Sequence, residues 1–240
     1  MFDFKQTQIK MKTRTISPEY QRIQHFNKEI SNMSHDDIEL KSPISFPLEC
    51  FVQEKVDGAN MGVSWSDGPI LRNRKHILKK GYIKTDTPAK IQFRSAWNWL
   101  HKHENDIKKV MKWCHSPITI YGEWMFAKHS IFYDKLPDLF LAYDIWCVDD
   151  QNFLSPDVVS EILDRTSIQY IKSEKLTLNS IQDIIQLSEK ESDYRNGIRE
   201  GIVIKTKDGR WVDDCFKVVN RYFERRSDFN EELIKNKLIK

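Results

Sequence analysis

Short apolar runs separated by turn residues recur along the chain and predict a core rich in β-strands. Residues 50–73 are predicted to form three strands, with turns at Asp57-Gly58 and Asp67-Gly68. Four more strands are predicted over the apolar runs 118–124, 140–148, 201–205 and 215–219. Most of these segments are short, which favours antiparallel pairing between neighbours over a long parallel array.

Helical periodicity and capping residues predict helices between the strands. A serine followed by proline is a typical helix start, so a first helix is predicted from Ser17-Pro18 to about residue 32. Apolar side chains at intervals of three, four or seven predict a longer helix over about 90–114. Serine caps predict two more, over about 155–166 and 180–194. Residues 220–240 are predicted to form a charged helical tail.

Strand pairs interrupted by helices indicate an α+β fold of mainly antiparallel sheets with flanking helices, rather than an alternating βαβ array. A chain of 240 residues with 40% hydrophobic and 30% charged residues can bury a sizeable core. We expect one domain over residues 1–240. It would consist of an N-terminal arm and helix (1–49), a core (50–219) and the tail.

Several classes of protein are excluded by composition. No apolar run reaches 18 residues, and the N-terminus has no apolar signal segment, so neither a membrane span nor a secretory signal is predicted. The cysteines lie far apart, in or next to apolar runs, which favours buried free thiols in a reducing, cytoplasmic compartment over disulfides or zinc. They are Cys50, Cys114, Cys147 and Cys215. The common glycine-rich, zinc-protease and serine-hydrolase motifs do not occur.

The net charge of +3 is small, but its distribution is uneven. Seven basic residues lie between Leu71 and Lys90, against the single acid Asp86. The basic residues are Arg72, Arg74, Lys75, Lys79, Lys80, Lys84 and Lys90. Such a strip is consistent with phosphate binding and equally with a solvated lysine-rich loop.

The stretch 54–60, with the sequence EKVDGAN, is the strongest candidate for chemistry. Lys55 follows an apolar run and precedes Gly58, which permits a tight turn or a close approach of the backbone to a ligand. Lys55 is therefore a candidate nucleophile. Taken alone, the four-residue string favours a surface lysine before a hairpin.

Four charged residues further along the chain change that balance. They lie at the ends or middles of predicted strands and are Arg74, Glu123, Glu200 and Lys217. An amine that attacks a phosphate, carboxylates that hold a divalent metal and cations that bind phosphates are the groups that nucleotidyl transfer requires. The amine must be neutral, although its ordinary pKa is about 10.4. We expect Lys205, Lys217 and a bound Mg²⁺ to favour that neutral form.

The order and spacing of these residues resemble the covalent nucleotidyltransferases, which are the ATP-dependent DNA and RNA ligases and the mRNA capping enzymes. Residues 55–58 resemble their motif I, and 54–60 resembles that of nick-sealing phage RNA ligases most. Further resemblances are Asn73-Arg74 to the next basic motif, 121–123 to motif III, 140–145 to motif IIIa, 200–205 to motif IV and 217–219 to motif V. Two positions depart from the pattern: Asn73 replaces a serine, and Val219 stands where a second lysine is common.

The resemblance implies a role for each matched residue. Lys55 would take AMP covalently, and Lys205 and Lys217 would contact the α-phosphate. Glu54 would lie at the adenine, partly through its backbone, and Asn60 near the ribose or the nick. Arg74 and Glu123 would contact the phosphate and the ribose. Tyr143 (or, less favoured, Phe140) would stack on the adenine. Glu200 and Glu123 would bind the metal. For Asp144 and His129, a structural role is favoured over a catalytic one.

The implied fold is a nucleotidyltransferase (ATP-grasp-like ligase) domain without an OB domain, since the 21 residues after motif V are too few for one. The implied function is an ATP-dependent RNA ligase for RNA repair. It would join a 3′-OH and a 5′-phosphate through lysyl-AMP and an adenylylated polynucleotide, with ATP and Mg²⁺ or Mn²⁺. The expected partner is RNA, as a nicked duplex or broken loop, with a partner protein or domain for substrate binding left open.

Three alternatives remain at this point. They are a DNA ligase of the same mechanism, a capping-type guanylyltransferase and a non-catalytic nucleic-acid-binding module. Besides the basic strip, Arg221, Arg225 and Arg226 are candidates for contact with the RNA backbone.

Overall fold

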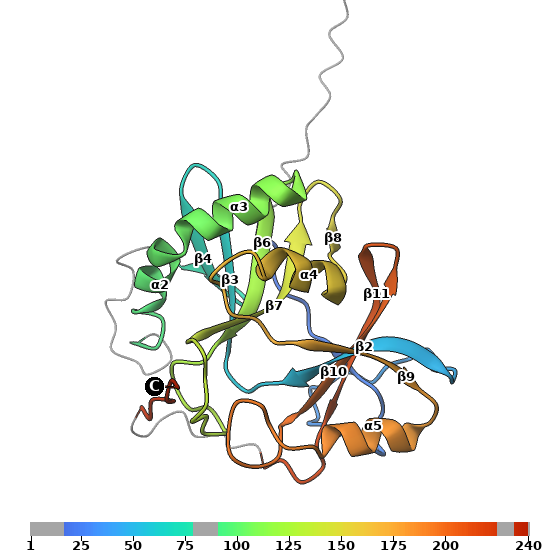
Figure 1. The fold of residues 1–240 in the computed structure, drawn as a ribbon. Helices are drawn as coiled ribbons and strands as arrows, with labels where there is room; N and C mark the ends of the chain where they lie inside the picture. The colour runs from blue at the N-terminus through green and yellow to red at the C-terminus, as the bar shows by residue number, and fades with distance from the viewer. Residues whose placement is uncertain (1–16, 79–90, 225–232, 240) are drawn as a thin grey trace, which may run out of the picture.

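Two β-sheets face each other in the computed structural model, which describes residues 17–78, 91–224 and 233–239 (Figure 1). The six-stranded sheet is antiparallel throughout, in the order β5 (Ile77–Leu78), β4 (Pro69–Asn73), β3 (Ala59–Trp65), β6 (Ile118–Trp124), β7 (Phe140–Cys147), β8 (Asn152–Phe153). The five-stranded sheet runs β1 (Gln24–His25), β11 (Trp211–Val219), β10 (Gly201–Asp208), β2 (Leu48–Lys55), β9 (Ser173–Leu178). Only its β1–β11 pair is parallel.

Four helices in the described part of the chain pack on the outer faces of these sheets. On the six-stranded sheet lie α2 (Ala96–Lys102), α3 (Glu104–Cys114) and α4 (Pro156–Leu163), whereas α5 (Ile181–Ser188) lies on the five-stranded sheet (Figure 1). The predicted α+β fold with mainly antiparallel sheets is confirmed, and no closed barrel occurs within the ranges described. None of these helices is long and apolar enough to cross a membrane.

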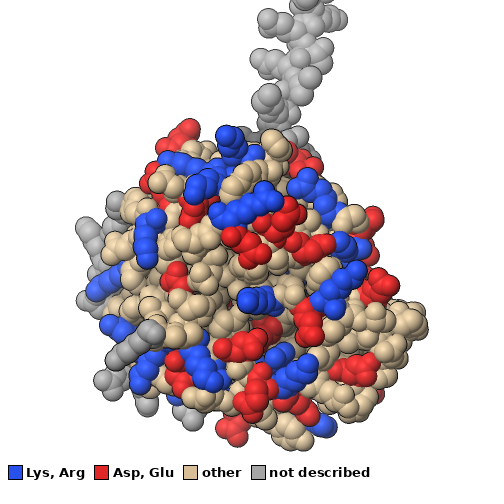
Figure 2. All heavy atoms as spheres, in the orientation of Figure 1, with Lys and Arg blue, Asp and Glu red and all other residues tan. Residues whose placement is uncertain are grey.

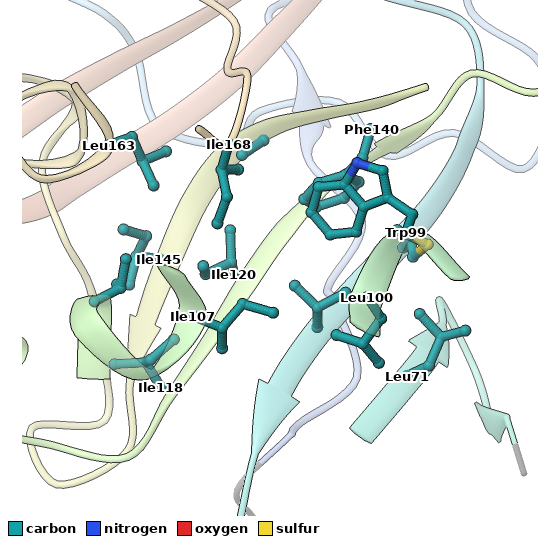
Figure 3. Close-up of a cluster of buried hydrophobic side chains, with 14 of the residues drawn as sticks. Leu71, Trp99, Leu100, Ile107, Ile118, Ile120, Phe140, Ile145, Leu163 and Ile168 are labelled. Carbon is teal, nitrogen blue, oxygen red and sulfur yellow. The ribbon is translucent and has the colours of Figure 1, made fainter. Parts of the chain in front are cut away.

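The larger core lies between the six-stranded sheet and α2–α4. Its fully buried side chains include Leu71, Leu100, Ile107, Ile120 and Phe140 (Figure 3). A second apolar cluster lies under α5, where Val52, Ile202 and Val218 point to the same side of the five-stranded sheet. Because side chains alternate along a strand, the opposite faces of both sheets carry the polar residues. Those two polar faces form the walls of the candidate site.

The predicted helix from Ser17 to residue 32 is wrong. This segment is extended and bonds to both sheets: the carbonyls of Ser17 and Pro18 accept from Arg72 and Tyr121, and β1 then pairs with β11. Its apolar residues serve different places, because Tyr20 is buried near the site and Phe26 packs in the cluster under α5. Tertiary contacts outweigh the serine-proline cap, whose contribution to stability is only about 1 kcal/mol.

The other helix predictions need adjustment. The long helix starts at Ala96 and breaks at His103, whose ring bonds to the Trp99 carbonyl (2.8 Å) and stacks on the Trp99 ring. The same carbonyl also accepts from the His103 amide at 3.1 Å, so two donors share it at the break. The helix predicted to reach 194 ends at Ser188.

The predicted helical tail is wrong for its described residues, 220–224 and 233–239, which contain no helix. Asn236 instead bonds to the Met125 and Ala127 carbonyls, so this stretch packs as an added extended segment. Residues 225–232, with Arg225 and Arg226, lie outside the described residues.

The strand predictions hold better. All seven predicted strands are present, and β1, β5, β8 and β9 were not predicted. The four cysteines are free, as expected; three of them are buried and Cys215 is partly exposed.

Candidate active site

A cavity of about 240 Å³ opens between the polar faces of the two sheets. Its walls come from β2, β10 and β11 on one side and from β3, β6 and β7 on the other. Eight of the nine predicted site residues line it, namely Glu54, Lys55, Asn60, Arg74, Glu123, Tyr143, Lys205 and Lys217. The ninth, Glu200, bonds directly to Lys55. Residues spread over 164 positions of sequence therefore meet at one place.

Lys55 ends β2, and the register of the sheet places Glu200 beside it. Gly201, the first residue of β10, pairs with Lys55 across the antiparallel ladder. The Lys55 ammonium lies 2.7 Å from both carboxylate oxygens of Glu200. A Cβ on Gly201 would lie 2.1 Å from the Val218 carbonyl oxygen, so only glycine fits at this strand start. The pairing of Lys55 with Glu200 is thus a consequence of strand register.

The pKa of Lys55 is raised in this setting. Burial on its own would lower the pKa of the amine, but the carboxylates of Glu200, Asp57 and Glu123 together outweigh burial. We expected Lys205 and Lys217 to favour a neutral Lys55; without bound nucleotide the acids prevail and hold Lys55 protonated.

Lys205 is committed to a buried ion pair. Its ammonium lies 2.6 Å from Asp144 Oδ1 and 3.3 Å from the Tyr143 carbonyl oxygen, and the Tyr20 hydroxyl donates to Asp144 Oδ2 at 2.7 Å. Both members of the pair are almost fully buried. This explains the acid in the apolar run 140–148 and supports the structural reading of Asp144. Lys205 still borders the cavity, where its role at the phosphate stays a prediction.

The wall from the six-stranded sheet carries polar atoms without partners. Asn60 pairs with Glu123 across β3 and β6, and the Asn60 amide donates to the Tyr143 hydroxyl at 2.6 Å. Three buried atoms in this wall have no hydrogen-bond partner within the described structure: Asn60 Oδ1, Glu123 Oε2 and Arg74 Nε. Buried polar atoms without partners are costly, and they commonly mark a place where a ligand binds.

The carboxylates of Glu123 and Glu200 suit a divalent cation that is bound together with phosphates. Burial, opposed by Lys55 and assisted by Asp57 and Glu200, raises the pKa of Glu123 to about 8. No group of three or more His, Cys, Asp or Glu in the described ranges could hold a metal by itself. Mg²⁺ usually binds through one or two carboxylates plus substrate phosphates and water. Glu123, with its unpartnered oxygen, and Glu200 match that donor set.

The turn after Lys55 is shaped by tight packing. The Asp57 carboxylate accepts from the Ser130 and Ile131 amides at 2.6 and 3.1 Å, so it anchors the loop that carries these two residues behind Lys55. A Cβ on Gly58 would come within 2.7 Å of Met125 Sδ, so the close approach at this position is to a side chain of the protein. Asp57 therefore serves both as a structural anchor and as a negative charge near Lys55.

A model of the RNA ligase family matches residues 48–219, more than two thirds of the chain. The chain belongs to the RNA ligase family. Its fold is similar to solved structures of the Naegleria gruberi RNA ligase. One mutant form with ATP and Mn has a TM-score of 0.57 at 16% identity over 86% of this chain and 57% of that chain. The form with PPi has a TM-score of 0.54 at 20% identity over 72% and 50%.

The chain thus spans about half the length of the Naegleria gruberi RNA ligase structures that it matches. No curated protein matches it. At these identities the structural similarity shows the fold alone. The family match begins at residue 48, so the segment that carries β1 and crosses both sheets lies outside the matched region.

This RNA ligase fold decides two points that the sequence left open. They are which aromatic residue reaches the cavity and what the Glu54 carboxylate binds. Phe140 is fully buried in the larger core against Trp99, with ring centroids 4.6 Å apart, so Tyr143 is the motif IIIa aromatic residue at the cavity. The Glu54 carboxylate accepts from the Ser192 hydroxyl and the Asp193 amide. It anchors that loop, which leaves its backbone for the expected adenine contact.

Sequence reasoning missed several residues of the cavity. Tyr20 and Ile23 line it from the segment that was predicted to be a helix, and Gln53 and Val203 line it from the strands. Gln53 had a detectable signal, because it is a polar residue two positions before Lys55 in an apolar strand and must share its face. Tyr20 had no such signal.

The basic strip is divided by the fold. Arg72 is buried and bonds to the Ser17, Asn73 and Arg74 carbonyls, so it is structural. Arg74 lines the cavity and Lys75 is exposed, while residues 79–90 lie outside the described ranges. On the face shown in Figure 2, basic and acidic side chains are interspersed. Arg221 pairs with Glu189 at 3.3 Å on the surface.

Proposed function

We propose that this protein is an ATP-dependent RNA ligase that joins a 3′-OH and a 5′-phosphate through lysyl-AMP and an adenylylated RNA. The observation that carries the proposal is Lys55, held by both oxygens of Glu200 in a cavity whose opposite wall has unpartnered polar atoms. Membership of the RNA ligase family supports it. So do the solved Naegleria gruberi RNA ligases, which contain ATP, AMP, Mn or PPi.

In the first step the Lys55 amine attacks the α-phosphorus of ATP. A phosphorus–nitrogen bond forms, the bond to the leaving oxygen breaks, and pyrophosphate departs with that electron pair. The amine must lose its proton first, and the Glu200 oxygens at 2.7 Å are placed to accept it. Lys217 and Lys205 border the cavity and would bind the α-phosphate.

Glu123 and Glu200 would hold Mg²⁺ or Mn²⁺, which would supply positive charge at the reacting phosphate. Carboxylates that are engaged in this way no longer raise the pKa of Lys55. The protonated lysine of the nucleotide-free protein would therefore become a better nucleophile only when substrate is bound. This coupling protects the amine from unproductive reaction.

Tyr143 would stack on the adenine. It is the aromatic side chain of motif IIIa that reaches the cavity, and its hydroxyl accepts from the Asn60 amide, which fixes the orientation of the ring. Arg74 and Asn60, each with an unpartnered buried atom, would contact the phosphate and the ribose or nick. These contacts would order the nucleotide before attack.

In the later steps AMP would pass from Lys55 to an RNA 5′-phosphate, and a 3′-OH would then attack and release AMP. The RNA would be a nicked duplex or a broken loop, with binding that weakens as salt rises. The reducing cytoplasm is the compartment that suits the four free thiols.

Mass spectrometry after incubation with ATP and Mg²⁺ tests the first step. We expect one added AMP on Lys55, none in Lys55→Met, and none with GTP. Sealing of matched RNA and DNA nicks tests the substrate. Absence of AMP on the wild type would contradict the enzyme proposal, label from GTP would favour a guanylyltransferase, and a strict need for a DNA 3′-OH strand would favour a DNA ligase.

A further inference from the structure

Lys217 reaches the cavity from β11, and a carboxylate from the N-terminal segment lies beside it. Asp37 Oδ1 is 3.6 Å from the Lys217 ammonium, and both side chains are mostly buried, with 11% and 15% of their surfaces exposed. Asp37 lies in the loop after β1, outside the region 48–219 that matches the RNA ligase family. The family pattern therefore assigns nothing to it.

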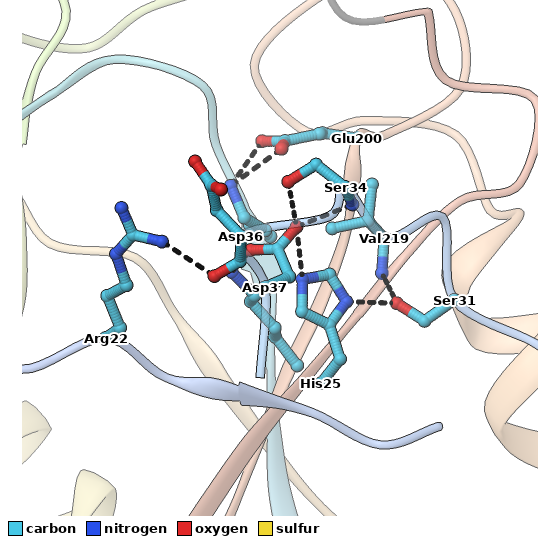
Figure 4. Close-up of polar contacts among 10 residues, drawn as sticks. Arg22, His25, Ser31, Ser34, Asp36, Asp37, Glu200 and Val219 are labelled. Carbon is cyan, nitrogen blue, oxygen red and sulfur yellow. Dashed lines mark hydrogen bonds and ion pairs between the residues drawn. The ribbon is translucent and has the colours of Figure 1, made fainter. Parts of the chain in front are cut away.

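Asp37 is fixed in one orientation. Its Oδ2 atom accepts from the amide and the hydroxyl of Ser34, each at 2.9 Å, and lies 3.3 Å from Nε2 of His25 (Figure 4). These contacts all fall on one carboxylate oxygen. The other oxygen, Oδ1, faces the Lys217 ammonium.

His25, the residue that supports Asp37, is tied to the same strand as Lys217. It is fully buried and pairs with Lys217 in the parallel β1–β11 register. Its Nδ1 lies 2.5 Å from the Ser31 hydroxyl, which in turn accepts from the Val219 amide at 2.9 Å (Figure 4). The loop 31–37 thus closes around His25 and meets β11 at Val219 and at Lys217.

The ion pairs of the three cavity lysines with Glu200, Asp144 and Asp37 differ in length. Lys55 and Lys205 lie at hydrogen-bond distance from their carboxylates, at 2.7 and 2.6 Å. The 3.6 Å between Lys217 and Asp37 exceeds a hydrogen bond, so charge attraction alone links these two atoms. Such a contact directs the flexible lysine without holding it as tightly as a hydrogen-bonded carboxylate would.

We propose that Asp37, held by Ser34 and His25, is a positioning residue that keeps Lys217 directed at the α-phosphate site. The inference rests on the proposed function and adds a supporting group to it. Motif V has only this lysine here, because Val219 occupies the second position. A lysine on four rotatable bonds loses considerable freedom when it binds phosphate, and ordering it beforehand removes part of that cost.

The test is a double-mutant cycle with Asp37→Asn and Lys217→Met, read as the rate of AMP transfer to Lys55 at saturating ATP. We expect Asp37→Asn to slow transfer roughly tenfold, the scale of one ordered lysine side chain. In the Lys217→Met background the same change should alter the rate less than about twofold. Asp36→Asn is the matched control, since Asp36 is exposed and pairs with exposed His35.

Thermal melting of each variant shows whether the fold is retained. If Asp37→Asn slowed transfer equally in both backgrounds, or no more than Asp36→Asn, Asp37 would be merely structural or irrelevant and the inference would be overturned. If the wild type took up no AMP, the proposed function would fail first. The inference would then be decided by calorimetry of ATP with Mg²⁺ in Lys55→Met: weaker binding on adding Asp37→Asn supports it, and equal affinity overturns it.

Discussion

The two walls of the cavity differ in whether their polar groups have partners within the protein. The five-stranded sheet presents lysines that already lie beside acids, in the pairs Lys55–Glu200, Lys205–Asp144 and Lys217–Asp37. The six-stranded sheet and the residue after β4 present buried atoms that have no hydrogen-bond partner among the described residues, namely Asn60 Oδ1, Glu123 Oε2 and Arg74 Nε. One wall is electrostatically satisfied without a ligand, and the other is not.

This difference indicates how such a site can be stable before it binds anything. Buried ammonium groups without partners would cost several kcal/mol each, so each lysine of this wall needs an acid beside it. In the wall from the six-stranded sheet, a neutral amide oxygen and a carboxyl group of raised pKa cost less free energy when they have no hydrogen-bond partner. Binding of a nucleotide would then exchange partners on the lysine wall and supply partners on the other.

Replacement of the nucleophile should have the largest effect. We expect Lys55→Arg to lower AMP transfer by about 10³-fold or more, as far as Lys55→Ala does, because a guanidinium keeps the charge but cannot act as the amine nucleophile. The measurement is intact-protein mass after incubation with ATP and Mg²⁺. Retained labelling in Lys55→Arg would place the nucleophile elsewhere in the lysine wall.

Loss of the buried pair should mainly affect stability. Lys205→Met leaves Asp144 with a buried charge that only Tyr20 partly satisfies, and we expect a loss of about 3–5 kcal/mol in unfolding free energy. The matched control is Lys207→Met on the same strand, whose more exposed pair with Asp157 should contribute about 0–1 kcal/mol.

Urea unfolding measures both variants of β10, and Asp144→Asn added to Lys205→Met should recover part of the loss. Equal effects of Lys205→Met and Lys207→Met would show that Lys205 is not a structural charge. The difference in polar pairing between the wall from the five-stranded sheet and the wall from the six-stranded sheet would then be smaller than the distances suggest.

The last effect, which is the smallest per pH unit, concerns the wall from the six-stranded sheet and depends on pH. The pKa of Glu123, about 8 in the folded protein, lies above its ordinary 4.5, so the native state binds more protons than the unfolded state between those values. Stability of the nucleotide-free protein should therefore fall as pH rises from about 4.5 to about 8, by at most about 1.4 kcal/mol per pH unit from this group.

Glu123→Gln should flatten that slope in thermal melts, whereas Glu49→Gln, at an exposed position of β2, should leave it unchanged. An unaltered slope in Glu123→Gln would mean that ionisation of Glu123 does not destabilise the folded protein.

The strand-turn-strand patterns were sufficient to predict the seven strands around motifs I, III, IIIa, IV and V, and hence the ends where Lys55 and Glu200 lie. Short apolar runs bounded by turn residues are a local property of the sequence, so the prediction made from them survives folding. The segment 17–32 shows the limit. Its apolar spacing fits a helix, but it lies extended because Arg72 and Tyr121 bond to its carbonyls from more than 50 residues away.

By itself, the sequence determined which chemical groups the site contains and in which order, since the motif residues are readable one by one. Only the tertiary structure decided their partners. Strand register places Glu200 on Lys55, and the N-terminal segment brings Tyr20 to Asp144 and Asp37 to Lys217. The physical reason is that electrostatic interactions depend on distance in space and on burial, and neither quantity is encoded in any local pattern of residues.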